Sequence, residues 1–273
     1  MAVSRRCRPF PNLKRRQDRL QRRKLENLVA VITGASNGCG RAAVREFIKE
    51  GAAVVGADRD EENGQALSEE LQSDRFLFVP ADVSRSGHVK AVVEAAQATF
   101  GGIDILFNQA GEIQVQPLLQ VTETDFDFLI NNNVRSVVLM TQACLPSMLQ
   151  KGRGAIITTS SVSASTATPM EAIYCTTKAA VTQFTRSVAV EFRDRGIRSN
   201  VISPGFVRTK HGEYEMEQLR QLNVPASEED IRTLQGRMCE PEEVARVAVF
   251  LASDDASFIN GADITVDNTF TVI

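Results

Sequence analysis

Residues 28–40 read LVAVITGASNGCG, and this stretch decides the fold. Its first five residues, 28–32, are apolar and rich in β-branched side chains, which is typical of a strand buried on both faces of a parallel sheet. Three glycines follow in the spacing G-x-x-x-G-x-G, and residues 41–50 then show the apolar spacing of a helix. A strand, a glycine-rich turn and a helix in this order predict that the pyrophosphate of a dinucleotide binds at the helix N-terminus, where unpaired N–H groups and the helix dipole favour anions.

A tight connection that binds nothing is the alternative interpretation, because the common fingerprint is spaced G-x-G-x-x-G. The next predicted strand, 52–57, bears on the cofactor because it ends at Asp58. An acid at this position hydrogen-bonds to the adenosine ribose hydroxyls and repels a 2′-phosphate. Asp58 and the neutral Asn37 in the glycine turn therefore predict NAD rather than NADP. Arg59 could still bind a phosphate, and Asp58 could be only a solvated acid at a strand end.

Strand and helix patterns alternate from this point to the end of the chain. Further strands are predicted at 76–79, 103–107, 155–159, 199–203 and 262–266. Helices are predicted at 87–100, 124–149 with a break near Pro146, 172–193 and 241–252. The alternation predicts an α/β fold: a single-domain, doubly wound, Rossmann-type parallel sheet of about seven strands with helices on both faces. Ligands bind beyond the carboxyl ends of the strands in such sheets, so we expect the site in the loops there.

Composition excludes several other classes of protein. The chain has 273 residues, of which 43% are hydrophobic, and it contains no apolar run of about 18 residues that could span a membrane. Its five cysteines show no C-x-x-C spacing, which fits a reducing compartment. His88 and His211 are the two histidines, so neither a multi-histidine metal site nor a histidine-based triad is expected.

Residues 1–24 differ from the rest of the chain in charge. They carry ten Arg or Lys and one Asp, a net charge of +9, whereas the whole chain has a net charge of −3. We expect a disordered tail here, in front of one catalytic domain at 25–273. The tail could be a mitochondrial presequence, it could contact RNA or anionic lipid, or it could have no role. The expected location is cytoplasmic, with the mitochondrial matrix as the alternative, and no nucleic-acid partner is expected apart from this tail.

A tyrosine and a lysine stand four residues apart in the predicted helix at 172–193. Residues at i and i+4 share a helix face, so the Tyr174 phenol and the Lys178 ammonium are expected to project into one cleft. A nearby cation favours the phenolate and lowers a tyrosine pKa from its usual value of about 10. Such a tyrosine can take a proton from an alcohol or return it to a carbonyl. A surface helix can produce the same spacing by chance.

Several motifs occur together in one order along the chain. They are TGASNGCG (33–40), NQAG (108–111), NNNVRS (131–136), SSVSA (160–164), YCTTK (174–178) and NVISPGFVRT (200–209). With Asp58 and the pair Asp82 and Val83, this set resembles the short-chain dehydrogenase/reductase family across residues 25–273. The resemblance implies an NAD(P)-dependent enzyme that interconverts alcohols and ketones, with a homotetramer as the usual assembly.

The resemblance also implies roles for particular residues. Tyr174 would be the acid/base, Lys178 would lower its pKa and hold the nicotinamide ribose, and Ser161 would hydrogen-bond to the reacting oxygen. Asn133 would hold a helix kink and a water that links Lys178 to solvent. The implied cofactor contacts are Gly34, Ser36, Asn37, Gly38, Cys39, Gly40, Asp58, Arg59, Asp82, Val83, Asn108, Ala110, Gly111, Tyr174, Lys178, Pro204, Gly205, Val207 and Thr209.

Some of these assignments have competitors. Ser160 competes with Ser161, which is favoured because it stands thirteen residues before Tyr174, as the family pattern asks. The two asparagines before Asn133 compete with it in the same way. Gln109 departs from the second Asn of the family's NNAG, and its larger side chain puts the affinity for the cofactor in doubt.

The segment 208–236 is predicted to be a lid that closes water out of the substrate site. Its acids Glu213, Glu215 and Glu217 are interpreted as a solvated face of a mobile lid rather than a metal site. His211 is interpreted as a neutral loop histidine, with a contact to the substrate as the alternative. The leading hypothesis is an NAD-dependent oxidoreductase for a small or medium secondary alcohol and its ketone, with a cyclic or hydroxylated substrate favoured over a long acyl chain. The rival hypothesis is a catalytically idle dinucleotide-binding protein that serves as a scaffold or redox sensor.

Overall fold

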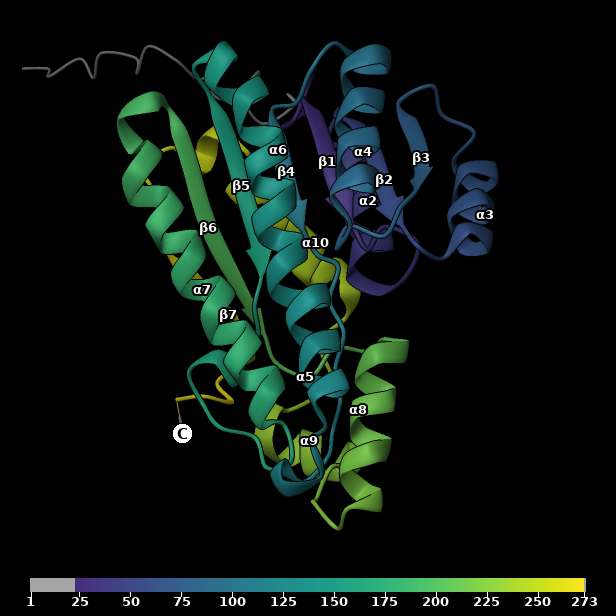
Figure 1. The fold of residues 1–273 in the computed structure, drawn as a ribbon, viewed down its shortest axis with the longest axis vertical. Helices are drawn as coiled ribbons and strands as arrows, with labels where there is room; N and C mark the ends of the chain where they lie inside the picture. The colour runs from purple at the N-terminus through teal and green to yellow at the C-terminus, as the bar shows by residue number, and fades with distance from the viewer. Residues whose placement is uncertain (1–22, 273) are drawn as a thin grey trace, which may run out of the picture.

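A seven-stranded parallel sheet organises the structure, a computed structural model that describes residues 23–272 (Figure 1). The strands are β1 (Val29–Thr33), β2 (Ala53–Asp58), β3 (Phe76–Pro80), β4 (Ile105–Asn108), β5 (Gly154–Thr159), β6 (Ile197–Pro204) and β7 (Asp263–Val266). Their spatial order is β3-β2-β1-β4-β5-β6-β7, and each neighbouring pair is parallel. The direction of the strand order changes between β1 and β4, which is where such sheets form a crevice for a ligand.

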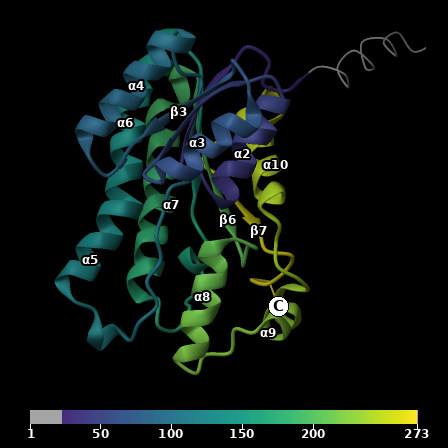
Figure 2. The same cartoon turned by 90° about the vertical axis from the view of Figure 1, so that its right-hand side faces the viewer.

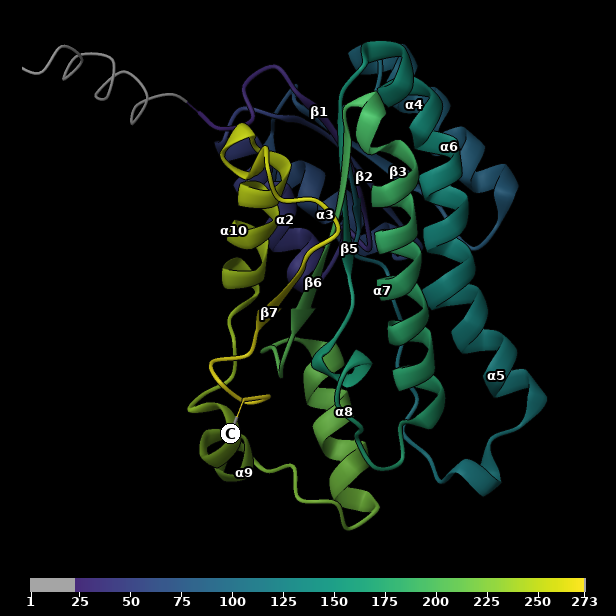
Figure 3. The ribbon, with the colours of Figure 1, turned by 90° about the vertical axis from the view of Figure 1, so that its left-hand side faces the viewer.

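Six helices cover the two faces of this sheet (Figure 3). They are α2 (Gly38–Lys49), α3 (Glu61–Leu71), α4 (Ser86–Phe100), α6 (Ser136–Lys151), α7 (Ala172–Phe192) and α10 (Pro241–Ala252). The helices α2, α3 and α10 contribute to the apolar core on one face, and α4, α6 and α7 to the core on the other. The predicted doubly wound, Rossmann-type fold is confirmed.

The apolar residues of β1 explain why both faces are covered. All five residues of the strand are buried. Ala30 and Ile32 belong to the core under α2 and α10, whereas Val31 belongs to the core under α4 and α6. Burying one large aliphatic side chain stabilises a fold by roughly 1.5–3 kcal/mol, so a run of such residues holds both helix layers on the sheet.

Three further helices extend beyond the carboxyl edge of the sheet (Figure 2). They are α5 (Glu123–Leu129), α8 (Lys210–Gln221) and α9 (Glu228–Gln235). A third apolar cluster, which includes Ile113, Tyr174, Met216 and Ile231, packs α8 and α9 against α7 and the segment after β4. The segment predicted as a lid is therefore folded as two helices over the ends of the strands.

The structure differs from the prediction in the segment 124–149. The helix does not break near Pro146; it passes through this residue, and the irregularity is instead a π-helical stretch, Ile130–Arg135, between α5 and α6. Pro146 is exposed, and a proline within a helix removes one main-chain hydrogen bond. The buried neighbours Leu145 and Met148 keep α6 on the sheet at this point.

The start of the described chain is packed from Leu25 onward. Residues 1–22 of the predicted tail lie outside the described residues; Arg23 and Lys24 are exposed, and Leu25 is fully buried. The Lys24 ammonium lies 3.3 Å from the carboxylate of Asp255. Within residues 23–272, no helix combines the length and the apolarity that a membrane crossing requires.

Candidate active site

The glycine turn brings the ends of β1 and β4 together. Gly34 has a φ of +67°, and a Cβ at this position would lie 2.9 Å from the Cα of Ala110. The Thr33 hydroxyl accepts the N–H groups of Gln109 and Ala110, each at 3.0 Å. A residue without a side chain suits both the left-handed backbone and the close approach. The turn and the segment 108–111 therefore form one continuous floor at the carboxyl edge of the sheet.

The start of α2 rests on the same turn. A Cβ on Gly40 would overlap the carbonyl oxygen of Gly34, and a Cβ on Gly38 would lie 3.0 Å from the Thr209 methyl group. No side chain caps the N-terminus of α2, so its first N–H groups are available to an anion. The turn thus fits the pyrophosphate of a dinucleotide, both in the space that the glycines leave and in the donors that it presents.

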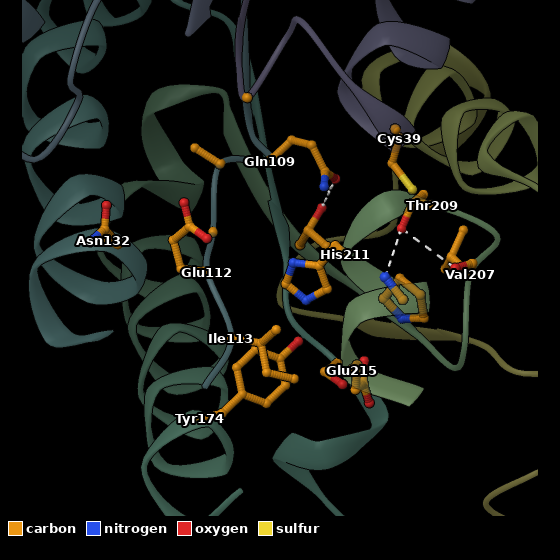
Figure 4. A pocket seen from close by; sticks show the side chains of 18 of the residues that line it. Cys39, Gln109, Glu112, Ile113, Asn132, Tyr174, Val207, Thr209, His211 and Glu215 are labelled. Carbon is orange, nitrogen blue, oxygen red and sulfur yellow. Dashed lines mark hydrogen bonds between the residues drawn. The ribbon is translucent and has the colours of Figure 1, made fainter. Parts of the chain in front are cut away.

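A cavity of about 860 Å³ runs from this turn to the start of α7 (Figure 4). Its volume lies in the upper part of the range for small-molecule and cofactor sites. The predicted site residues that line it are Gly34, Asn37, Gly38, Cys39, Asp58, Arg59, Asp82, Val83, Ala110, Gly111, Ser161, Tyr174, Lys178, Pro204, Gly205, Val207 and Thr209. The structure therefore brings most of the predicted residues, from every part of the chain, to one place.

Four predicted residues, Ser36, Gly40, Asn108 and Asn133, lie behind the wall of the cavity. Asn108 is 2% exposed, and its amide nitrogen donates to the Thr141 hydroxyl at 3.3 Å. Ser36 is fully buried and donates its hydroxyl proton to a backbone carbonyl. These residues brace the wall, and their direct contact with a cofactor stays a prediction.

The end of β2 presents a fixed carboxylate to the cavity. Asp58 accepts the N–H of Ser36 at 2.9 Å and the N–H of Asp60 at 3.0 Å. Asn37, in the glycine turn, donates its amide to the Asp60 carboxylate at 2.8 Å. Hydrogen bonds thus fix the carboxylates of Asp58 and Asp60 at this end of the cavity, and the amide of Asn37 is used in the bond to Asp60.

Arg59, the neighbour of Asp58, forms an ion pair with Glu112 from the segment after β4. Glu112 therefore compensates the cation that could have bound a phosphate. Asp82, at the end of β3, accepts the N–H and the hydroxyl of Ser84 at 3.0 and 2.6 Å. Burial works to raise the pKa of Asp82, but these bonds and the charge of Arg59 bring it below its usual value, so the carboxylate is ionised.

Asn133 lies in the π-helical stretch between α5 and α6. Its amide oxygen accepts the N–H of Glu112 at 2.7 Å, and its amide nitrogen donates to the Glu112 carbonyl at 2.8 Å and to the Thr177 hydroxyl at 3.0 Å. A π-helical turn within a helix is frequent at functional sites. Here it joins the segment after β4 to α7. Of its competitors, Asn131 is exposed, and Asn132 donates to a carbonyl of its own helix.

Tyr174 and Lys178 lie at the other end of the cavity, on the first turns of α7. Both side chains are buried, at 6% exposure each. The Lys178 ammonium lies 5.5 Å from the centre of the Tyr174 ring and donates to the Thr159 carbonyl at 3.2 Å. The predicted convergence of the two side chains on one cleft agrees with this geometry, but the ammonium lies over the ring rather than beside the phenol oxygen.

The structure distinguishes Ser161 from Ser160. The Ser161 hydroxyl accepts the N–H of Ser163 at 3.1 Å and lines the cavity together with Tyr174, whose pKa it acts to lower. Ser160 instead donates to the Lys178 carbonyl at 3.0 Å and accepts from the Thr182 hydroxyl at 2.7 Å, so both capacities of its hydroxyl are used inside α7. The geometry accordingly favours Ser161 as the residue that meets a ligand.

The protonation of Tyr174 differs from the prediction. Burial raises the pKa of Tyr174 well above its usual value, and the charges of Glu215 and Glu171 act in the same direction, whereas Ser161 opposes them. Burial also lowers the pKa of Lys178, to about 8, which weakens the cation that was expected to stabilise a phenolate. Tyr174 therefore holds its proton at neutral pH and is poised as a proton donor.

His211 belongs to the first turn of α8 and lines the cavity, so it is not a loop residue. Its ring centre lies 6.2 Å from that of Tyr174. Burial and the charge of Lys178 lower its pKa to about 4, so the imidazole is neutral, as the sequence suggested. Among residues 23–272, no three His, Cys, Asp or Glu side chains are grouped in a way that could hold a metal ion.

Glu215 contradicts the interpretation of the lid acids as a solvated face. The other two acids, Glu213 and Glu217, are exposed, but Glu215 lines the cavity beside Tyr174 (Figure 4) and interacts with Glu171. Glu215 shares its helix face with the buried Leu219, four residues on. The sequence would have revealed this orientation only if α8 had been predicted as a helix.

Gln109, the departure from the family pattern, does not fill the cavity. Its amide oxygen accepts the hydroxyl proton of Thr159, at the end of β5 (Figure 4). The longer side chain is thus anchored along the wall. The space above the glycine turn stays open to a ligand.

Three comparisons with known proteins agree with this geometry. A sequence model of the family described as enoyl-(acyl carrier protein) reductase matches residues 34–271. D-threitol dehydrogenase of Mycolicibacterium smegmatis is 36% identical over 251 residues, which cover 91% of this chain and 95% of the relative. Meso-2,3-butanediol dehydrogenase of Serratia marcescens is 38% identical over 248 residues, which cover 91% of this chain and 96% of the relative.

A solved structure shares the whole fold. The crystal structure of 3-ketoacyl-(acyl-carrier-protein) reductase from Brucella melitensis, complexed with NADH, matches with a TM-score of 0.83 at 32% identity and covers 91% of this chain and 100% of that chain. Sequence, fold and site geometry thus lead to one assignment. The chain belongs to the short-chain dehydrogenase/reductase family and is an oxidoreductase of the kind that binds a nicotinamide cofactor.

Proposed function

We propose that the protein is an NAD-dependent oxidoreductase that interconverts a small or medium secondary alcohol and its ketone. The observation that carries this proposal is the convergence of Tyr174, Ser161 and Lys178 on the cavity that also contains the glycine turn. Oxidation of an alcohol removes a hydride from carbon and a proton from oxygen. A dinucleotide site and a proton-transfer group in one cavity meet both needs.

The substrate class draws support from the relatives and from the cavity wall. Two relatives are named for small alcohols that carry more than one hydroxyl group, D-threitol and meso-2,3-butanediol. The third is named for a ketoacyl group on a carrier protein. The polar side chains Gln114, His211 and Glu215 on the cavity wall favour a small hydroxylated substrate over a long acyl chain.

The chain's own residues would divide the proton transfer among them. Ser161 hydrogen-bonds to the substrate oxygen and holds it beside the Tyr174 phenol. In ketone reduction Tyr174 donates its proton to that oxygen, and in alcohol oxidation the phenolate takes the proton back. Lys178, anchored on the carbonyl of Thr159, holds its ammonium over the ring, and while it is protonated it would oppose the effect of burial that disfavours the phenolate. When bound, NAD accepts the hydride in oxidation, and its reduced form supplies it in reduction.

The preference for NAD rests on the adenosine end of the cavity. Asp58 places a fixed carboxylate where a 2′-phosphate would come, and Glu112 already pairs with Arg59. We expect NADH to bind at least tenfold more tightly than NADPH, and Asp58→Ala to narrow that gap by roughly ten- to hundredfold, because a charge repulsion is removed. Fluorescence titration of both cofactors measures this. Equal affinities of the two cofactors for the unmodified protein would contradict the preference.

Assembly and location are extensions of the same proposal. A homo-oligomer, with a tetramer as the form that the family resemblance implies, is the proposed assembly. A cytoplasmic location is proposed, with the mitochondrial matrix as the alternative if residues 1–22 act as a presequence; those residues lie outside the described part of the chain.

Oxidation of NADH with a panel of small ketones tests the redox function. Tyr174→Phe keeps the ring and its packing but removes the proton, so we expect kcat to fall by about 10²–10⁴-fold while NADH binding is retained. Tyr214→Phe, the same change at an exposed tyrosine of α8, is the matched control. Equal rates for the unmodified protein and Tyr174→Phe, or NADH binding without any turnover, would favour the idle scaffold.

A further inference from the structure

A buried pair of carboxyl groups joins the lid to the catalytic helix. Glu171 immediately precedes α7 and is 1% exposed, and Glu215 projects from α8 into the cavity. Their side chains interact, and burial raises the pKa of both groups, that of Glu171 to about 7. Like charges on the two groups disfavour the ionisation of both, in addition to the effect of burial. The pair therefore retains a proton to a higher pH than an isolated, exposed carboxyl group would.

Glu171 and Gln114 have buried side-chain oxygens that accept no hydrogen bond from the described residues. Neither carboxyl oxygen of Glu171 has a hydrogen-bonding donor among the described residues. The same is true of Oε1 of Gln114, which is buried and belongs to a residue that lines the cavity from the segment after β4. Buried acceptors without partners are rare in native proteins and call for an explanation. Of these two residues Gln114 lines the cavity, and a hydroxyl group of a ligand beside Glu215 would supply the donor that the Gln114 oxygen lacks.

Opposite charges act on each other at this end of the cavity. The charge of Lys178 opposes the rise in the pKa of Glu215. His211 is neutral because burial and Lys178 lower its pKa, and Tyr174 is neutral because burial raises its pKa. A carboxylate or an ammonium group on the substrate would leave an uncompensated charge in a desolvated site, so the site suits a neutral ligand.

We propose that Glu215, positioned by Glu171, binds a second hydroxyl group on the substrate, so that the enzyme acts on small neutral diols or polyols and on the corresponding hydroxy ketones. A hydroxyl group donates one hydrogen bond and accepts others, and a carboxyl pair that retains a proton offers both counterparts. Figure 4 shows Glu215 and Tyr174 reaching the same end of the cavity, which allows one small molecule to meet both. This inference rests on the proposed function.

Two ketones that differ by one hydroxyl group test the role of Glu215. We would measure kcat/KM for 3-hydroxy-2-butanone and for 2-butanone with NADH, in the unmodified protein, in Glu215→Gln and in Glu213→Gln. Glu213 is an exposed acid on the same helix, so Glu213→Gln makes the same chemical change outside the cavity. The hydroxyl group also makes the neighbouring carbonyl more reactive. We therefore compare, between variants, the ratio of kcat/KM for 3-hydroxy-2-butanone to kcat/KM for 2-butanone. We expect Glu215→Gln to lower the ratio about tenfold or more, chiefly through KM, and Glu213→Gln to leave it unchanged.

Glu171 acts through Glu215 and is a positioning residue, so its test needs a conservative rescue. Glu171→Gln can still donate a hydrogen bond to Glu215, whereas Glu171→Met has a similar length and cannot. We expect Glu171→Gln to retain most of the preference for the hydroxy ketone and Glu171→Met to lose it, with kcat for 2-butanone within about twofold in both. Loss of turnover of both ketones in Glu171→Met alone would assign Glu171 a structural role and overturn its positioning role.

The outcomes separate this inference from the proposed function. A ratio that stays the same in Glu215→Gln and Glu213→Gln would overturn the binding role of Glu215 and leave the redox function intact. A preference for 3-amino-2-butanone over 3-hydroxy-2-butanone would overturn it in favour of a cationic substrate. NADH binding without reduction of any ketone would overturn the proposed function, and the inference with it.

Discussion

The carboxyl group of Glu171 favours folding when it is protonated and opposes folding when it loses its proton as the pH rises. Its pKa is raised to about 7 in the folded protein by burial, whereas an unfolded chain returns it to about 4.3. Between these values the folded state keeps a proton that the unfolded state releases. The stabilising contribution is therefore complete below about pH 4 and disappears as the pH rises through 7.

Glu171→Gln mimics the protonated form. We expect its free energy of unfolding to rise by about 2 kcal/mol relative to that of the unmodified protein when the pH is raised from 5.5 to 8. Urea unfolding followed by circular dichroism at both pH values measures this difference. The titratable groups that interact with Glu171 are Glu215, Tyr174 and Cys175, and all three stay in the variant. Glu213→Gln is the control. A free-energy difference that does not change with pH would contradict the raised pKa.

At the scale of single residues, the sequence predicted which side chains meet at the cavity, but it did not predict the direction of the Tyr174 pKa shift. Tyr174, Ser161 and Lys178 meet at one cavity as their spacing implied. The sign of the Tyr174 pKa shift could not be predicted, because it depends on burial and on Glu215, which arrives from a helix more than thirty residues away in the chain. Desolvation and remote charges are properties of the folded molecule and leave no local pattern.

At the scale of elements, one side chain of the π-helical stretch 130–135 joins it to two other segments of the fold. Asn133 satisfies the N–H and the carbonyl of Glu112 and also contacts Thr177. We expect Asn133→Ala to destabilise the protein by roughly 1–3 kcal/mol, because it leaves the part-buried N–H and carbonyl of Glu112 without their partner, and to lower kcat as the segment after β4 loosens. Thermal unfolding and NADH oxidation measure the two effects.

The neighbouring Asn131 provides the matched control for this variant. It is exposed and lies in the same π-helical stretch, so Asn131→Ala should change stability by less than about 0.5 kcal/mol. Equal unfolding temperatures for Asn133→Ala and Asn131→Ala would show that the bridge to Glu112 contributes nothing to stability.

The elements that the sequence missed share a weak apolar pattern. α3 buries only Gly64 and Leu67, and α8 buries Met216 and Leu219 in a segment that is otherwise largely charged, so each offers few apolar residues by which a helix could be recognised. The central strands were predicted from short apolar runs that are buried on both faces, as in β1, whereas the edge strands β3 and β7 are only partly buried. The π-helical stretch left no pattern to read, since tertiary contacts of Asn133 define it and local propensity does not.

At the scale of the whole molecule, an exposed apolar residue lies near the last strand of the sheet. Phe258 is fully exposed, and β7, which follows it, is the edge strand with one unpaired side. Edge strands and exposed aromatic side chains are commonly covered by another subunit. We therefore expect a mass in light scattering that is a multiple of 29.9 kDa, and a shift toward the single-chain mass in Phe258→Ser.

Leu119→Ser serves as the control for assembly, because Leu119 is equally exposed but lies beyond the carboxyl edge, away from β7. It should leave the mass unchanged. A single-chain mass for the unmodified protein would refute the proposed oligomer. A mass change in Leu119→Ser alone would show that the subunits contact each other near Leu119 and not at β7.

The contact between Thr209 and Gly38 has a kinetic consequence. Thr209 caps the start of α8 through its hydroxyl, and its methyl group lies beside Gly38 in the glycine turn. The helix that covers the substrate end of the cavity is therefore joined to the turn that binds the dinucleotide, and binding of the dinucleotide should fix the position of α8. Turnover should then follow a compulsory order in which the dinucleotide enters first and leaves last, and product inhibition should be competitive between its oxidised and reduced forms alone.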